Sequence, residues 1–242
     1  MKEIMKVIKR IKNSSSHSRF QVKWRRRREG KTNYYKRKNL LIQDKQKFNA
    51  SKYRLVVRLS KKNLLCQLIY SRLEGDFVLS SIYSKNLNLI GISLINNNFP
   101  TAYIAGLHLS NKFFKEKFSF TNEKNSLENK LKVILDLGLT RITTGNKVFA
   151  TMKGAVDGGF EIPHNEKRFP GYKKNETFNI ETMKNRIEGK HIIEYMELLK
   201  EEDEEKYSKQ FKRFIEKNIS PSDYWKMNCN VIKNIIDKSN ST

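Results

Sequence analysis

The sequence has few of the features that build membrane spans, disulfide frameworks or metal centres. Its 242 residues include only two cysteines, four histidines and four prolines. The longest apolar stretches, such as Leu64–Tyr70, are strand-sized, far below the roughly 20 residues that a membrane-spanning helix needs. We therefore expect a protein that does not enter a membrane.

The two cysteines, Cys66 and Cys229, are far apart and lie in apolar contexts. No CxxC pair is present, and the histidines are scattered, so no metal-ligand set is expected. This pattern predicts two buried thiols in a reducing compartment.

The first dozen residues do not have the pattern of a secretory signal. Met1–Lys12 alternates Lys with Ile and Val, and no apolar block follows. The segment could form a short basic helix at a membrane surface or an arm that orders on RNA. The second interpretation is favoured because the basic sequence continues through Lys38.

The sequence has a large and unevenly distributed positive charge. The formal charge is +24, from 49 Lys and Arg against 25 Asp and Glu. Residues 1–62 hold 22 Lys or Arg against three acids, a net of +19, whereas residues 180–242 hold 12 of each. Such an excess favours an anionic partner, of which nucleic acid is the usual one and a lipid surface the other.

The middle of the chain has the pattern of a folded α/β core. Alternating apolar residues predict strands at Tyr53–Ser60, Leu64–Leu73, Phe77–Tyr83 and Leu131–Leu137. The segment Glu74–Asp76, with its central glycine, suits a hairpin turn, so the first three strands should form an antiparallel meander.

Helix start signals follow the strands. Asn98 with Pro100 predicts one helix start and Thr143–Asn146 a second, whose helix should end at Gly158. Apolar stripes after residue 190 predict helices, the last one capped by Ser220.

The sharpest local signal is the basic and aromatic segment Arg19–Asn39 (RFQVKWRRRREGKTNYYKRKN). Four consecutive arginines cannot lie on one face of a helix or strand, so they suit a segment surrounded by phosphates. Four aromatic residues are interleaved, and such rings stack on unpaired bases. A localisation signal or a disordered tail is the alternative, but the aromatics favour RNA contact.

Two later segments carry weaker signals. The turn Thr143–Lys147, together with Lys153, could hold a phosphate with free amides, hydroxyls and lysines, or could be no more than a capped helix. The loop His164–Tyr172 (HNEKRFPGY) could clamp RNA or be a rigid surface loop. His164 could act as a general base, but no partner nucleophile is evident.

A nuclease is the alternative from another function class. Asp136, Asp157 and Glu161 could bind magnesium in an RNA-processing enzyme, although solvated or capping carboxylates are the commoner outcome of so weak a pattern. A general RNA-binding or chaperone protein is the third interpretation.

Long strings of the sequence resemble the universal ribosomal protein L-eighteen family, in the eukaryotic form traditionally called ribosomal protein L-five. They are FQVKWRRRREGKTNYYKRKNLLIQDKQKFN, KYRLVVRLS, CQLIYSRLEGD, TGNKVFATMKGAVDGGFEIPH and KRFPGY. The stretch EEDEEKYSKQFKRFI is similar to the eukaryotic C-terminal extension. The resemblance extends from about Ser18 to Asp223.

The resemblance implies an α/β (α+β) fold with a mixed, largely antiparallel sheet flanked by helices. It implies a basic, extended N-terminal arm (residues 1–49), an α/β core (50–172) and an α-helical C-terminal extension (173–242). The expected function is to bind 5S rRNA and anchor it in the central protuberance of the large (60S) subunit. The expected partners are 5S rRNA, large-subunit rRNA, the ribosomal protein of the universal L-five family and other central-protuberance proteins.

The resemblance also implies a location and a set of contact residues. The expected location is the cytoplasmic ribosome, after assembly in the nucleus and nucleolus. No cofactor is expected, and any magnesium or potassium would be bound together with rRNA. The residues expected to bind RNA, from the patterns and the resemblance together, are Phe20, Lys23, Trp24, Arg25, Arg26, Arg27, Arg28, Lys31, Thr32, Tyr34, Tyr35, Arg37, Lys38, Arg54, Arg58, Thr144, Gly145, Asn146, Lys147, Lys153, His164, Lys167, Arg168, Phe169 and Tyr172.

Overall fold

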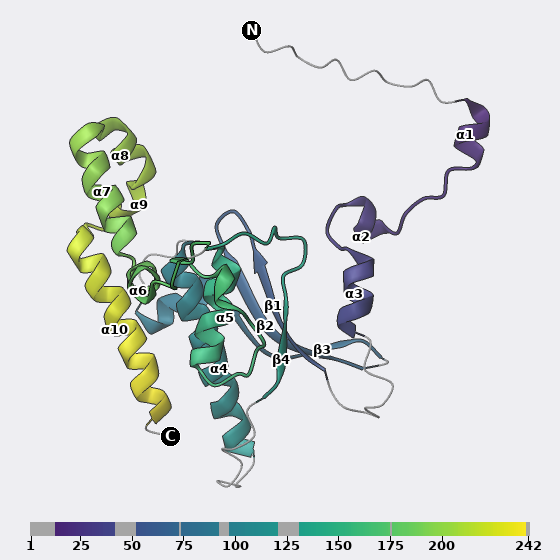
Figure 1. Cartoon of the computed structure of the whole chain (residues 1–242), viewed down its shortest axis with the longest axis horizontal. Helices are drawn as coiled ribbons and strands as arrows, with labels where there is room; N and C mark the ends of the chain where they lie inside the picture. The colour runs from purple at the N-terminus through teal and green to yellow at the C-terminus, as the bar shows by residue number, and fades with distance from the viewer. Residues whose placement is uncertain are drawn as a thin grey trace.

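A computed structural model of the protein (Figure 1) describes residues 13–41, 52–72, 74–91, 97–120, 131–174 and 176–240. The prediction for Met1–Lys12 falls outside these ranges. No helix within the described ranges is both long and apolar enough to cross a membrane.

A mixed sheet lies at the centre of the molecule. Its strands are β1 (Tyr53–Leu59), β2 (Leu64–Ser71), β3 (Asp76–Tyr83) and β4 (Val133–Asp136), in the order β3-β2-β1-β4. The β1–β2 and β2–β3 pairs are antiparallel, and the β1–β4 pair is parallel. The prediction of a mixed, largely antiparallel sheet is therefore confirmed.

Short turns produce the meander, as the sequence predicted. The Ser60 amide donates to the Asn63 carbonyl over 2.8 Å between β1 and β2. Between β2 and β3, Arg72 and Gly75 exchange backbone hydrogen bonds, and Gly75 adopts a φ of 147° that favours glycine.

Two long helices cover one face of the sheet (Figure 1): α4 (Phe99–Phe120) and α5 (Lys147–Asp157). They approach closely because Gly106 and Gly154 have no side chains. A Cβ on Gly154 would lie 2.1 Å from the Tyr103 carbonyl oxygen. Both helices begin at predicted caps, since Asn98 accepts from the Thr101 amide and Asn146 from the Val148 amide.

The main core lies between these helices and the sheet. Its buried side chains include Leu55, Val57 and Leu68 from the strands and Ile104 and Met152 from the helices. A seven-residue 3-10 helix (η1, Ser84–Ile90) follows β3.

The two thiols behave differently. Cys66 is fully buried in the core, where burial raises the pKa of its thiol, as predicted. Cys229 is only partly buried, which corrects the prediction for that residue.

Helices form the C-terminal part of the chain, as predicted. They are α6 (Ile180–Glu188), α7 (Lys190–Glu202), α8 (Glu204–Gln210), α9 (Lys212–Glu216) and α10 (Pro221–Asn240). The hydroxyl of Ser220 accepts from the Asp223 amide at the start of α10, which confirms the predicted cap.

The C-terminal helices have a small core of their own, made of Met196, Leu199, Phe211, Phe214 and Tyr224. The same helices also join the main core, because Met183 of α6 and Val231 and Ile235 of α10 belong to it. The chain divisions at residues 49 and 172 stay a prediction.

Candidate nucleic-acid interface

Three short helices lie in the described part of the arm, residues 13–41, which corrects the expectation of an extended arm. They are α1 (Ser14–Ser18), α2 (Arg25–Arg28) and α3 (Tyr34–Leu41). The Lys, Arg and Leu residues of α3 have good helix propensity, and the Asn33 side chain accepts from the Lys36 amide near its start. Figure 1 shows α3 beside the sheet and α1 far from it.

The four arginines of α2 form one helical turn, so their side chains leave the backbone in different directions. Arg25 pairs with Glu29 at 2.9 Å, Arg26 donates to the Thr32 hydroxyl at 2.9 Å, and Arg28 donates to the Lys23 carbonyl at 2.9 Å. The prediction that the arginines project around the backbone is confirmed.

Gly30 makes the sharp turn between α2 and α3. Its φ of 66° is left-handed, which favours glycine. The turn returns the amides of Lys31 and Thr32 to the Arg26 carbonyl, at 2.9 and 3.2 Å. These hydrogen bonds close the turn after α2, and α3 begins at Tyr34.

Large aromatic side chains of the arm are open to solvent. Phe20 is 65% exposed, Trp24 69% and Tyr35 76%. Trp24 meets Tyr34 edge to face, with ring centroids 4.6 Å apart. Rings exposed among arginines suit unpaired nucleotides, because each nucleotide combines a base with a flat face and a negatively charged phosphate.

A chain of ion pairs connects the arm to the open face of the sheet. Arg37 of α3 lies 2.8 Å from Asp76 of β3, which lies 3.0 Å from Arg54 of β1. Arg54 lies 3.1 Å from Asp136 at the end of β4, and Asp136 lies 3.0 Å from Arg58.

The surroundings of Asp76 affect the pKa of its carboxylate in two opposing ways. Burial alone would raise its pKa, but hydrogen bonds from Ser71 and Arg37 and the charge of Arg54 outweigh this effect and lower it. Asp76 therefore stays ionised and joins an arm residue to a core residue.

Arg54 is not on the surface that the sequence predicted for it. Its side chain is 2% exposed and is held between Asp76 and Asp136. The alternation along β1 correctly placed Arg54 and Arg58 on one face, but only Arg58, at 44% side-chain exposure, reaches solvent. We assign Arg54 to holding the interface together, not to contacting RNA.

The structure brings the predicted turn and the predicted loop together. The Thr144 hydroxyl donates to the Lys167 carbonyl at 3.1 Å, and the Gly145 amide donates to the Arg168 carbonyl at 2.9 Å. Lys167 and Arg168, in the 3-10 helix η2 (Glu166–Arg168), remain exposed. The two segments thus form one surface.

The amides expected to hold a phosphate at this turn have partners within the protein. Gly145, Asn146 and Val148 all donate to other protein oxygens. The ammonium of Lys147 donates to the Asn97 carbonyl at 2.8 Å, and burial lowers its pKa. Lys153 pairs with Asp157. The turn therefore caps a helix, and its contact with RNA stays a prediction.

Two residues of the loop also serve the fold. Phe169 is 2% exposed and packs in the main core, so it does not stack on RNA from this position. His164 Nδ1 lies 2.7 Å from the Ile162 carbonyl oxygen, and its ring meets Phe169 edge to face. Tyr172 is partly buried.

Two of the three carboxylates of the nuclease hypothesis are paired with cations, and the third, Glu161, is exposed. Asp136 binds Arg54 and Arg58, while Asp157 binds Lys153 and accepts from the Tyr103 hydroxyl at 2.9 Å. Over the described residues, no group of three His, Cys, Asp or Glu side chains could hold a metal ion.

Comparison with known proteins identifies the family. The family model described as ribosomal large subunit proteins 60S L5 and 50S L18 matches residues 18–165. The large ribosomal subunit protein uL18 of Caenorhabditis briggsae is 43% identical over 231 residues, which cover 89% of this chain and 79% of that protein. The chain belongs to this family.

Further relatives carry the same name. The large ribosomal subunit protein uL18 of Caenorhabditis elegans is 44% identical over 226 residues, with 87% of this chain and 77% of that protein covered. The protein of that name from Eimeria tenella is 43% identical over 244 residues, with 92% and 78% covered. As a member of the family, the chain is a structural protein of the large ribosomal subunit and not an enzyme, so the RNA-processing hypothesis is wrong.

Sequence reasoning missed the two carboxylates that hold the interface. Asp76 was assigned only to a turn, and Asp136 was expected to be solvated or capping. The Asp136 side chain does accept from the Gly138 amide at 2.9 Å, but it is only 6% exposed and pairs with two arginines. One sequence pattern could have predicted these ion pairs: an acidic residue at the end of one strand, next to a strand that carries two arginines.

Proposed function

We propose that this large-subunit protein binds 5S rRNA through its arm and the neighbouring sheet edge, and anchors the RNA in the central protuberance. The observation that carries the proposal is the arm itself. Its arginines point in several directions, and its exposed rings lie among them. The resemblance of the Phe20–Asn49 string to the 5S rRNA-binding family supports the choice of RNA.

The finer partners follow from the same resemblance. The ribosomal protein of the universal L-five family and large-subunit rRNA would contact the bound particle, and assembly would begin in the nucleus. The exposed Lys167 and Arg168 would form a second basic contact beside the turn at Thr144.

The mechanism needs no reaction. Each phosphate that a Lys or Arg neutralises releases counterions, and each such contact adds roughly 0.7–0.9 to the salt dependence of binding. Recognition of one RNA would come from its shape and from stacking of unpaired bases on exposed rings such as Trp24 and Tyr35.

The test replaces Arg25–Arg28 with four glutamines in the full chain. The control replaces Lys200, Lys206, Lys209 and Lys212 with glutamine, which removes the same charge from exposed positions of the C-terminal helices. Affinity for 5S rRNA should fall sharply for the arm variant, with a salt slope lower by about 3. The control variant should lose much less affinity for 5S rRNA. Equal losses in both variants would show that the arm is not the binding element.

A further inference from the structure

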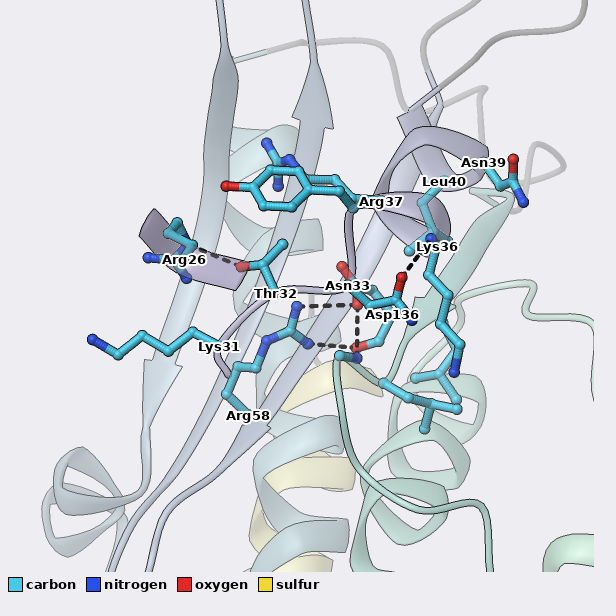
Figure 2. Close-up of a pocket in the computed structure, with 14 residues that line it drawn as sticks. Arg26, Lys31, Thr32, Asn33, Lys36, Arg37, Asn39, Leu40, Arg58 and Asp136 are labelled. Atoms are coloured by element: carbon cyan, nitrogen blue, oxygen red, sulfur yellow. Dashed lines mark hydrogen bonds and ion pairs between the residues drawn. The ribbon is translucent and has the colours of Figure 1, made fainter. Parts of the chain in front are cut away.

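A basic groove lies between the arm and the end of the sheet (Figure 2). It measures about 710 Å³ and runs from the Gly30 turn and α3 to the end of β4. Small-molecule sites have volumes of roughly 300–1,000 Å³, so a single nucleotide fits a space of this size. Its charged lining residues are Arg26, Lys31, Lys36, Arg37, Arg58 and Asp136.

The guanidinium of Arg58 is fixed in one orientation in the groove. One terminal nitrogen donates to the Asp136 carboxylate at 3.0 Å, and the other donates to the backbone carbonyls of Asp136 and Val57 at 2.8 and 3.0 Å. Figure 2 shows the two hydrogen bonds to Asp136. A planar group held by three hydrogen bonds loses little freedom when a ligand stacks on it.

Gly138 covers one flat face of this guanidinium. A Cβ on Gly138 would lie 2.9 Å from Cζ of Arg58, 3.0 Å from one terminal nitrogen and 3.1 Å from Nε, so the glycine backbone packs directly against the plane. The φ of Gly138 is 61°, which also favours glycine. The Arg58 side chain is 44% exposed and lines the groove, so a ligand in the groove can reach it.

Two lysines share the groove with Arg58. Lys31 and Lys36 both line it, and they lie to opposite sides of Arg58 in the view of Figure 2. Lys31 pairs with Glu29 at 2.8 Å but keeps a side chain that is 61% exposed. A flat cationic group and two lysines in one groove suit a nucleotide, because they can take a base and its neighbouring phosphates.

We infer that the groove receives one unpaired nucleotide of the RNA, with its base stacked on the Arg58 guanidinium and its phosphates paired with Lys31 and Lys36. The inference rests on the proposed RNA-binding function and assigns the binding of one nucleotide to this groove. A free mononucleotide has the same chemistry, and the experiment separates the two sources.

The test compares the full-length Arg58→Lys variant with wild type. Lysine keeps the charge and can still pair with Asp136, but it has no flat face. The probes are an eight-nucleotide single-stranded RNA and a duplex of the same sequence. The variant should bind the single strand about tenfold more weakly, within the range for loss of one stacked base, and should bind the duplex unchanged. The salt slope should not change, because the charge is the same.

Two further variants keep the result interpretable. Arg186→Lys on α6 makes the same chemical change at an exposed position outside the groove and should bind both probes like wild type. Gly138→Ala alters no charge but displaces the guanidinium, so it should repeat the loss. The inference is overturned if Arg58→Lys binds the single strand as well as Arg186→Lys does.

Crosslinking gives a readout that does not depend on how a variant folds. A single strand carrying 4-thiouridine should crosslink to wild type at residues 31–40 or 135–138, and crosslinks found only elsewhere would refute the groove. Uridine 5′-monophosphate, added at the concentration at which the oligonucleotide saturates the protein, should not displace the oligonucleotide. Displacement would make the groove a mononucleotide site and would overturn the assignment to RNA.

The test of the groove and the test of the proposed function can give different answers. Preference of wild type for 5S rRNA over another RNA tests the function, whereas the difference between the Arg58 and Arg186 variants on single strands tests the groove. Either result can be positive while the other is negative.

Discussion

Replacing Asp136 with asparagine should destabilise the fold, because the change leaves a buried arginine short of countercharge. Arg54 is 2% exposed, and Asp136 is one of its two carboxylate partners. Removing one partner of a buried ion pair costs about 3–5 kcal/mol, whereas asparagine keeps the shape of the side chain. Asp76 remains 3.0 Å from Arg54, so we expect the lower end, about 3 kcal/mol.

Urea unfolding measures this loss. With a denaturant dependence of about 2 kcal/mol per molar, the midpoint should fall by about 1.5 M. The control is Glu176→Gln, which breaks a pair with Lys173 whose side chains are 59% and 72% exposed. Such a surface pair contributes about 0–1 kcal/mol, so the control midpoint should barely move.

A double-mutant cycle isolates the interaction itself. Arg54→Gln combined with Asp136→Asn should cost less than the sum of the single changes, by about 0.5–3 kcal/mol. A loss below about 1 kcal/mol for Asp136→Asn, or strictly additive costs, would refute the reasoning, because water would then be replacing the lost partner.

Three further changes test other parts of the structure. Gly154→Ala should destabilise the fold by about 3 kcal/mol and lower the thermal midpoint, because the new methyl group would meet the Tyr103 carbonyl oxygen. Burial and the charge of Arg186 lower the pKa of His191 in the folded chain to about 4. Between pH 6.5 and pH 4 the unfolded chain therefore binds a proton at this histidine that the folded chain does not bind. Stability should therefore fall as the pH drops from 6.5 to 4, and His191→Gln should flatten that dependence in urea titrations. Asp76→Asn removes the ion pair to Arg37, so trypsin should cut the arm several-fold faster; unchanged cleavage would show that this pair does not hold the arm.

The features predicted correctly depend on nearby residues. Strand alternation placed β1, β2 and β3 within two residues of their observed ends, and cap residues placed the starts of α4, α5 and α10. These signals are local, because a cap bonds an amide two or three positions away and a strand needs only alternating burial.

The features predicted wrongly depend on distant residues. Arg54 and Asp136 are 82 positions apart, and they meet because the parallel register sets Val56 opposite Asp136. A basic residue on an alternating strand has the same local pattern whether it faces RNA or a buried carboxylate. Phe169 shows the same ambiguity, since an aromatic residue in a basic loop suits either stacking on a base or packing in the core.

The site was predicted best in the arm. The arginine run and the exposed rings have the arrangement that the sequence indicated, because each depends on a few consecutive residues. The groove could not be predicted, since it needs α3 and the end of β4 to lie together, and this arrangement depends on the tertiary fold.

The central claim is that this ribosomal protein recognises 5S rRNA and not RNA in general. The most direct test is competition at physiological salt between 5S rRNA and a transfer RNA of similar size for the purified full chain. Specific recognition predicts a preference of at least about tenfold for 5S rRNA, beyond the charge attraction that both RNAs share. Equal binding of the two RNAs would contradict the claim, because it would show that the basic arm binds phosphate without regard to the RNA that carries it.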